Sequence, residues 1–302
     1  MTNPVLISVL FAITLATHAG AQPIDGLPQL KDHSFPVYYS AGHQQRAESI
    51  ALRIEKAISY HQELLGFKPV VTLLVLNEAD WQQYTTEPVV YGMPHYIEKA
   101  ERLVVAAEDN AFWKSFLPPT DQLPENLRQS IQATYRGKDG QLTMQPFFDL
   151  LAIHELGHAF HMQGELTMQR NWMGELFSNI LLHTYIAEKE PESLPALTIF
   201  PQMVIAAGTG GYPFTSLQDI QERYSEIARS YPRNYGWYQC RWHSAAAGIY
   251  DAGGKKVLRK LWNALKTKKE ILNDGELVAY LRKKADKSIA GMVENWERDM
   301  VK

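Results

Sequence analysis

The hydrophobic pattern changes midway along this chain of 302 residues. Before residue 117, a stretch with helical spacing of apolar residues, His43–Leu65, lies among short runs rich in β-branched residues. Those runs are Phe35–Ser40, Pro69–Leu76 and Arg102–Ala107. Beyond the prolines at 118 and 119 and the glycine-containing segment 137–140, almost every apolar pattern has the helical period. The pattern predicts an α+β fold, with a small N-terminal α/β subdomain that contains a short sheet and a mainly helical subdomain after it.

The second half divides into a series of expected helices, separated by short polar or glycine-containing segments. They are Phe147–Met162, Met173–Lys189, Leu194–Ala207, Ser216–Arg229, Tyr235–Ala252, Lys255–Lys268 and Gly275–Arg298. The helix Lys255–Lys268 has an apolar stripe and a basic face, which we interpret as a solvated surface. We expect the two subdomains to comprise residues 22–116 and 117–302.

The first 21 residues predict a signal peptide. Pro4–Ala16 is an apolar run too short to span a bilayer, and Ala19-Gly20-Ala21 matches a small-x-small cleavage pattern. The segment before the run lacks Lys and Arg, so a buried N-terminal helix is the alternative. We expect export to a periplasm or out of the cell, without stable membrane insertion.

Charge and cysteine content narrow the kinds of partner and site. The sequence has 30 Lys and Arg against 33 Asp and Glu, a net charge of −3 that argues against nucleic acid as a partner. Cys240 is the only cysteine, which excludes an intrachain disulfide and a cysteine-based zinc site. We interpret Cys240 as a buried small hydrophobe, so any metal site must use histidines and carboxylates.

The strongest chemical signal is His154-Glu155-Leu156-Gly157-His158, within an expected helix. Residues four apart share a helix face, so the two imidazoles can converge on one metal ion. Glu155 projects to the side of that face, where a base acting on an activated water is needed. Gly157 leaves space for the close approach of another element or of a substrate.

A catalytic zinc site usually has three protein ligands, so a third must be found. His161 lies one turn further along the same face, but one straight helix cannot wrap three turns around a small ion. Glu175, at the start of the next helix, is the better candidate, and a helix N-terminal carboxylate is its structural alternative. Asn179 shares the face of Glu175 and could accept a hydrogen bond from a ligand imidazole.

His154-Glu155-x-x-His158 followed 17 positions later by Glu175 resembles the zinc-binding motif of gluzincin metallopeptidases. The resemblance implies that these three positions bind Zn²⁺ and that Glu155 is the catalytic base. It also implies the peptidase MA-like arrangement, an α/β part before a helical part. The aminopeptidase signature Gly-x-Met-Glu-Asn is absent, which argues against trimming of amino termini.

Peptide hydrolysis also requires a donor that stabilises the developing oxyanion. The resemblance directs attention to the aromatic helix that begins near Asn234, where Tyr238 is the closest match and Tyr235 the second. His243 is a further option, and core packing is the alternative for the whole aromatic set. By the same resemblance, Arg102–Ala107 is either an edge strand that pairs with an extended substrate or a structural strand.

These features predict an exported zinc-dependent metallopeptidase with a peptide or protein substrate. Two other functions stay open at this stage. The site could hydrolyse an ester or a non-peptide amide, because zinc chemistry does not specify its substrate. The chain could also be an inactive gluzincin-like binding protein, although Glu155 argues against that because a structural site has no use for a base. The sequence predicts no oligomeric state.

Overall fold

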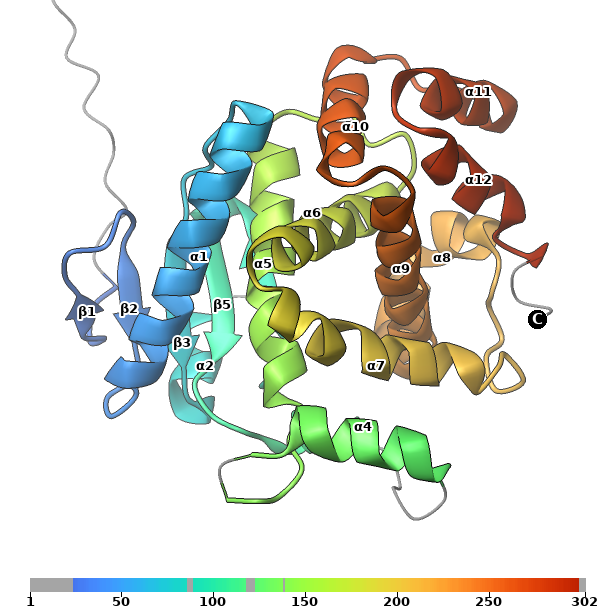
Figure 1. The fold of residues 1–302 in the computed structure, drawn as a ribbon. Coiled ribbons are helices and arrows are strands. Elements are labelled where there is room, and N and C mark those ends of the chain that lie inside the picture. The colour runs from blue at the N-terminus through green and yellow to red at the C-terminus, as the bar shows by residue number, and fades with distance from the viewer. Residues whose placement is uncertain (1–23, 86–88, 118–122, 138, 299–302) are drawn as a thin grey trace, which may run out of the picture.

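The structure, a computed structural model, describes residues 24–85, 89–117, 123–137 and 139–298. A five-stranded sheet belongs to the first part of the chain, and helices make up nearly all of the second part (Figure 1). The mixed α+β class is therefore confirmed. The predicted signal peptide, residues 1–21, lies outside the described residues, as do residues 118–122 beside the predicted subdomain boundary.

The sheet has the order β1-β2-β3-β5-β4. Its inner strands β2, β3 and β5 are parallel, and the outer strands β1 and β4 pair antiparallel with their neighbours. All residues of β3 are buried, as expected for a continuous apolar run at the centre of a sheet. The strands are β1 Gln29–Leu30, β2 Val37–Tyr39, β3 Thr72–Leu76, β4 His95–Ile97 and β5 Arg102–Ala106.

Of the two alternatives for Arg102–Ala107, the structure supports the structural strand and contradicts the edge strand. β5 pairs with β3 on one side and with β4 on the other, so both of its edges are occupied. The edge strand on this side of the sheet is β4, whose three residues directly follow the turn at Tyr91–Pro94. β4 contacts helix α5 (Gln145–Gln163), so this edge of the sheet lies beside the helix that carries the histidine motif.

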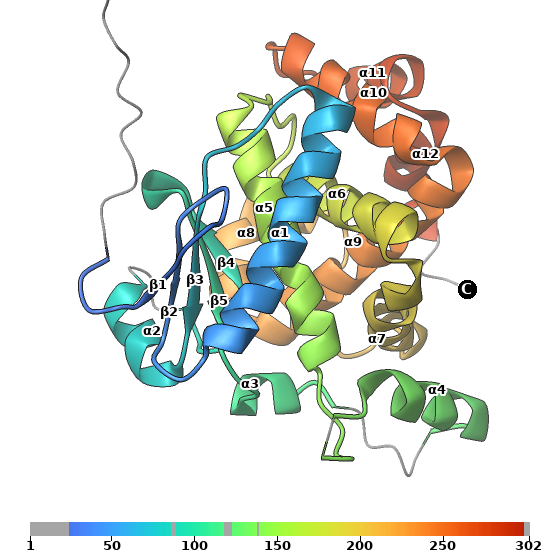
Figure 2. The ribbon, with the colours of Figure 1, turned by 60° about the vertical axis from the view of Figure 1, so that its left-hand side comes forward.

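Helix α1 (Gln44–Leu65) and helix α5 pack against the sheet and against each other (Figure 2). α1 ends at Gly66, which adopts a left-handed conformation with φ of 71°. Arg46 of α1 forms an ion pair with Asp149 of α5 at 2.6 Å and donates to the carbonyl of Ala106 at the end of β5. One guanidinium group thus joins α1, the sheet and α5, and fixes α5 relative to the sheet.

The helical part follows the predicted order with one correction. The expected helix Gly275–Arg298 is two helices, because Asp286 accepts a hydrogen bond from the Ser288 N–H and starts a new helix. Three helices before residue 136 were not predicted. The remaining helices are α2 Glu78–Tyr84, α3 Ala111–Lys114, α4 Glu125–Tyr135, α6 Met173–Lys189, α7 Leu194–Ala206, α8 Leu217–Ser230, α9 Pro232–Gly253, α10 Lys255–Thr267, α11 Asp274–Lys284 and α12 Lys287–Asn295.

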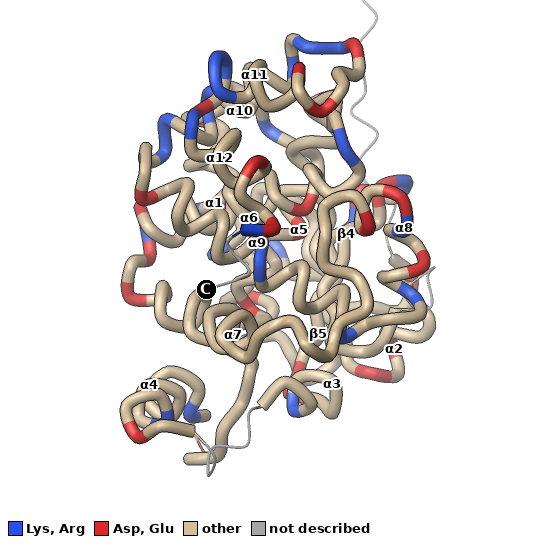
Figure 3. The backbone as a smooth tube through the Cα atoms, turned by 90° about the vertical axis from the view of Figure 1, so that its right-hand side faces the viewer, with Lys and Arg blue, Asp and Glu red and all other residues tan. Residues whose placement is uncertain are grey.

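The C-terminal helices carry much of the basic charge. α10 buries Val257, Leu258, Leu261 and Leu265 and exposes most of its Lys and Arg, and blue segments mark α10 and α11 in Figure 3. This arrangement is consistent with a solvated basic face. Among the helices that the structure describes, none is both long enough and apolar enough to cross a membrane.

Candidate metal centre

Helices α5 and α6, consecutive in the chain, meet in direct contact at Gly157. A Cβ atom at this position would lie 2.7 Å from the Cα of Ser178 and 2.8 Å from its Cβ. No side chain larger than hydrogen fits between these backbones. The close approach brings the histidines of α5 next to the first turns of α6.

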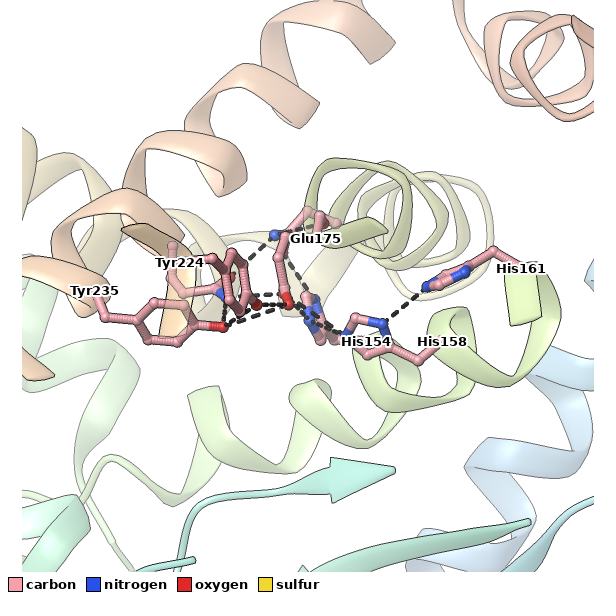
Figure 4. Close-up of polar contacts among 8 residues, drawn as sticks. His154, His158, His161, Glu175, Tyr224 and Tyr235 are labelled. Atoms are coloured by element: carbon pink, nitrogen blue, oxygen red, sulfur yellow. Dashed lines mark hydrogen bonds and ion pairs between the residues drawn. The ribbon is translucent and has the colours of Figure 1, made fainter. Parts of the chain in front are cut away.

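The side chains of His154, His158 and Glu175 converge between the two helices (Figure 4). Nε2 of His154 lies 3.1 Å from Oε2 of Glu175 and 3.2 Å from Nε2 of His158. The distance from His158 Nε2 to Glu175 Oε2 is 3.6 Å. We call the triangle formed by these three atoms the ligand triangle. These three groups could hold a metal ion.

The ligand triangle has the dimensions of a tetrahedral site. Ligands about 2.0–2.2 Å from a zinc ion, at tetrahedral angles, lie roughly 3.3–3.6 Å from one another. The longest observed side, 3.6 Å, falls in that range, and the other two, 3.1 and 3.2 Å, are slightly shorter. The donor set of two imidazoles and one carboxylate, with a fourth position left over, is that of catalytic rather than structural zinc sites.

Asn179 fixes the tautomer of His154. Nδ2 of Asn179 donates to the Glu175 carbonyl at 3.0 Å, which leaves Oδ1 facing Nδ1 of His154 at 3.2 Å. Because an amide oxygen only accepts, Nδ1 of His154 carries the proton. Nε2 therefore presents its lone pair to the ligand triangle, as metal binding requires.

His161 does not belong to the ligand triangle, but it contacts a member of it. Its Nε2 lies 3.0 Å from Nδ1 of His158, on the side away from Glu175 (Figure 4). Burial and the nearby charge of His158 together lower the pKa of His161 to about 3, so the ring is neutral and its Nε2 can accept a hydrogen bond. When His158 uses Nε2 for a metal, its Nδ1 donates to His161. The spacing of three residues could have predicted this contact.

Glu175 offers one oxygen to the ligand triangle, and its other oxygen is held by tyrosines. Oε1 accepts from the hydroxyl of Tyr224 at 2.6 Å and from that of Tyr235 at 3.3 Å. Nε2 of Gln239 donates to Oε2 at 2.8 Å. Burial favours the neutral acid, but the positive charge of His158 and the close contacts with both imidazoles outweigh it and hold the pKa of Glu175 well below its usual range. Positive charge within the ligand triangle, from protons or a metal ion, stabilises this carboxylate.

The two candidate tyrosines have different surroundings. Tyr235 is half-buried and faces Glu175, whereas Tyr238 is fully buried and donates to the carbonyl of Ser216 at 2.7 Å. The structure brings Tyr235, and not Tyr238, to the ligand triangle. Tyr224, absent from the sequence-based candidates, reaches it from α8, where the backbone of Arg223 leaves helical geometry directly before it.

Glu155 lies beside the ligand triangle without belonging to it. Burial raises the pKa of its carboxyl to about 8, while the charge of His154 and the backbone N–H of Tyr96 in β4 act in the opposite direction. A cation held by the triangle would also lower this pKa. Burial and the charge of Glu175 raise the pKa of the Tyr235 hydroxyl, and the charge of Glu155 adds a smaller contribution in the same direction.

His243 is close to the site but has a different environment. Its ring centroid lies 6.3 Å from that of His154, and burial lowers its pKa well below the usual value. We interpret His243 as a neutral packing residue.

Cys240 is buried, as predicted, and burial raises the pKa of its thiol.

The ligand triangle opens towards His158. The side chain of His158 keeps 14% of its surface exposed, against 6% for His154 and 10% for Glu175. Two surface cavities of about 490 and 850 Å³ lie elsewhere, near α12, and neither has a histidine among its described lining residues. The ligand triangle is therefore our candidate for the functional centre.

Comparison of the chain with protein-family models, with curated proteins and with solved structures returns no match. The function must therefore be inferred from the chemistry of the centre itself.

Proposed function

We propose that this chain is an exported zinc-dependent metallopeptidase of the gluzincin type. The observation that carries the proposal is the ligand triangle, with sides of 3.1 to 3.6 Å, and a separate carboxylate beside it. Three protein ligands leave a fourth position open, and Glu155 is available as a base. A purely structural metal site would need neither feature.

A zinc ion held by His154, His158 and Glu175 would supply Lewis acidity and would lower the pKa of a water molecule towards 7. Glu155 accepts a proton from the attacking water, whose oxygen bonds to the carbonyl carbon of the substrate. Tyr235 donates a hydrogen bond to the oxyanion that develops on that carbonyl. Glu155 then delivers the proton to the leaving nitrogen as the carbon–nitrogen bond breaks, which yields a carboxylate and an amine.

The edge strand supports a peptide as the substrate. β4 is the outer strand next to α5, and an extended chain can add to a sheet edge through backbone hydrogen bonds. The N–H of Tyr96 in this strand lies at Glu155, so the strand borders the base directly. A peptide held on β4 would therefore run past Glu155.

The test replaces Glu155 with Gln. Glu155→Gln keeps the size of the side chain and leaves the three ligands intact, so we expect zinc to remain bound at one ion per chain while hydrolysis falls at least 100-fold. The matched control is Glu63→Gln, at an exposed position on α1, which should hydrolyse like wild type. Full activity in Glu155→Gln would disprove the assigned base.

The bond that is cleaved is tested with an unlabelled peptide mixture and mass analysis of the products. Cleavage at internal peptide bonds supports the proposal. Turnover of ester or non-peptide amide substrates alone would reassign the reaction, and metal binding without any turnover would identify a binding protein.

A further inference from the structure

Two tyrosine hydroxyls share one oxygen of the zinc-binding carboxylate. Tyr224 donates to Oε1 of Glu175 at 2.6 Å, which is a short and strong contact for a hydroxyl and a carboxylate. Tyr235 reaches the same oxygen at 3.3 Å, beyond the usual range for such bonds. The oxygen is therefore satisfied mainly by Tyr224.

The hydrogen atoms around Tyr235 can be assigned from its neighbours. Its hydroxyl oxygen accepts from Nε2 of Gln239 at 2.8 Å. Its own hydrogen is left for Oε1 of Glu175 at 3.3 Å or for the Tyr224 hydroxyl oxygen at 3.0 Å. The hydrogen of Tyr224 is already used in the short bond to Glu175. Tyr235 is thus the donor with the weaker attachment.

The hydrogen bond from Tyr224 lowers the cost of moving the Tyr235 hydroxyl away from Glu175. A buried carboxylate oxygen that loses its only donor pays the full desolvation cost of that group. With Tyr224 in place, Oε1 keeps its short hydrogen bond, and only the long contact is lost. Both tyrosines are half-buried as residues, and their hydroxyls meet at Glu175.

We propose that Tyr224 is a positioning residue, which keeps Oε1 of Glu175 hydrogen-bonded and so frees the Tyr235 hydroxyl for the substrate. The inference rests on the proposed function and adds to it a residue on a separate helix. Without the Tyr224 hydroxyl, Tyr235 becomes the only tyrosine donor to Oε1 and is retained there. Tyr224 therefore acts through Tyr235.

The test is a double-mutant cycle on the zinc-loaded protein with Tyr224→Phe, Tyr235→Phe and the double variant. We expect Tyr224→Phe to lower kcat about 10-fold, with KM and zinc affinity within about threefold of wild type. Tyr235→Phe should lower kcat by roughly 10²–10³-fold, as for loss of an oxyanion donor. The double variant should be no slower than Tyr235→Phe. The matched control is Tyr250→Phe. Tyr250 is on the same helix as Tyr235, but its hydroxyl is hydrogen-bonded to Glu188 of α6, so this variant should behave like wild type.

Three outcomes would overturn the inference: an unchanged kcat in Tyr224→Phe, losses that multiply in the double variant, or a zinc affinity that falls in parallel with kcat. The last outcome would mean that Tyr224 only supports metal binding. Failure of the proposed function looks different, because zinc-loaded wild type would then cleave no peptide. In that case, calorimetry measures the affinity for a phosphinic peptide, whose phosphinate group resembles the tetrahedral oxyanion, and so tests the role of Tyr224. Binding about 10-fold weaker in Tyr224→Phe, with no additional loss in the Tyr235→Phe background, supports it, and equal affinity overturns it.

Discussion

The contact between α5 and α6 at Gly157 gives the sharpest test of how the fold creates the centre. In Gly157→Ala, the new methyl group would lie 2.7 Å from the Cα of Ser178 and 2.8 Å from its Cβ and Oγ. Carbon atoms in ordinary contact lie about 3.5–4.0 Å apart, so the helices must separate by roughly 1 Å. No rotamer change relieves the clash, because the nearest atom belongs to the backbone.

That separation acts directly on the ligand triangle, since its histidines are on α5 and its carboxylate is on α6. The distance from His154 Nε2 to Glu175 Oε2 would rise from 3.1 Å to about 4 Å, beyond the roughly 3.3–3.6 Å that tetrahedral zinc allows. We expect zinc affinity to fall at least 10-fold. Overpacking at a tight contact should also lower the free energy of unfolding by about 1–3 kcal/mol.

The assay combines urea denaturation of the metal-free protein with zinc titration against a competing chelator. Gly248→Ala is the matched control, because this glycine is also helical and nothing lies within 4 Å of the added Cβ. It should gain about 0.5–1 kcal/mol of stability from the higher helix propensity of alanine. If Gly157→Ala binds zinc and resists urea like wild type, the backbone contact does not set the ligand spacing.

Other predictions follow from the same structure. Removal of zinc with a chelator should lower the melting temperature, because metal at about 1,000 times its Kd adds roughly 4 kcal/mol to the free energy of unfolding; an unchanged melting curve would argue against a bound ion. Asn179→Ala should weaken zinc binding about 10–100-fold in a competition titration, whereas Asn179→Asp, which keeps an acceptor for His154, should retain it. Burial lowers the pKa of His61 to about 3 in the folded protein. Below the ordinary histidine pKa of 6.5, the unfolded state therefore binds more protons than the folded state, and the free energy of unfolding falls as the pH is lowered. Titration of His61 should lower the free energy of unfolding by about 2 kcal/mol between about pH 7 and about pH 5. His61→Leu should abolish this difference when urea titrations are compared at the two pH values.

The sequence was sufficient where one element contains all the information. The boundaries of α6 match the prediction, and those of α5 differ by one or two residues, because both helices are long apolar runs with clear ends. The spacing of His154 and His158 then determines that they share a face. Glu175 could be added because a short connection brings the next helix back to the same place.

The sequence was insufficient where pairing or packing decides. β4 has only three residues and no apolar alternation, and it becomes an edge strand only through its pairing with β5. The choice between Tyr235 and Tyr238 depends on the rotation of α9. Stacking of Tyr238 on Trp296 turns its face of the helix into the core. Gln239 could have indicated Tyr235, because it lies four residues later and so adds a second polar side chain to the same helix face.

Tyr224 illustrates a different limit. It lies 49 residues from Glu175 in the sequence, on a helix whose pattern contains no sign of a binding site. Its importance follows only from the partners of Glu175. A carboxylate that gives one oxygen to a metal must have its other oxygen satisfied, and in a buried site a donor from elsewhere in the chain has to supply that bond.

The hydrogen bonds around the centre also bear on whether it holds a cation. Asn179 directs the lone pair of His154 inward, and the tyrosines leave Oε2 of Glu175 facing it at 3.1 Å. Two electron-rich atoms at that distance in a buried site repel each other unless positive charge lies between them. A proton can supply that charge for one pair of atoms, but a single ion satisfies all three members of the ligand triangle at once. The surrounding residues therefore favour an ion even though none of them binds it.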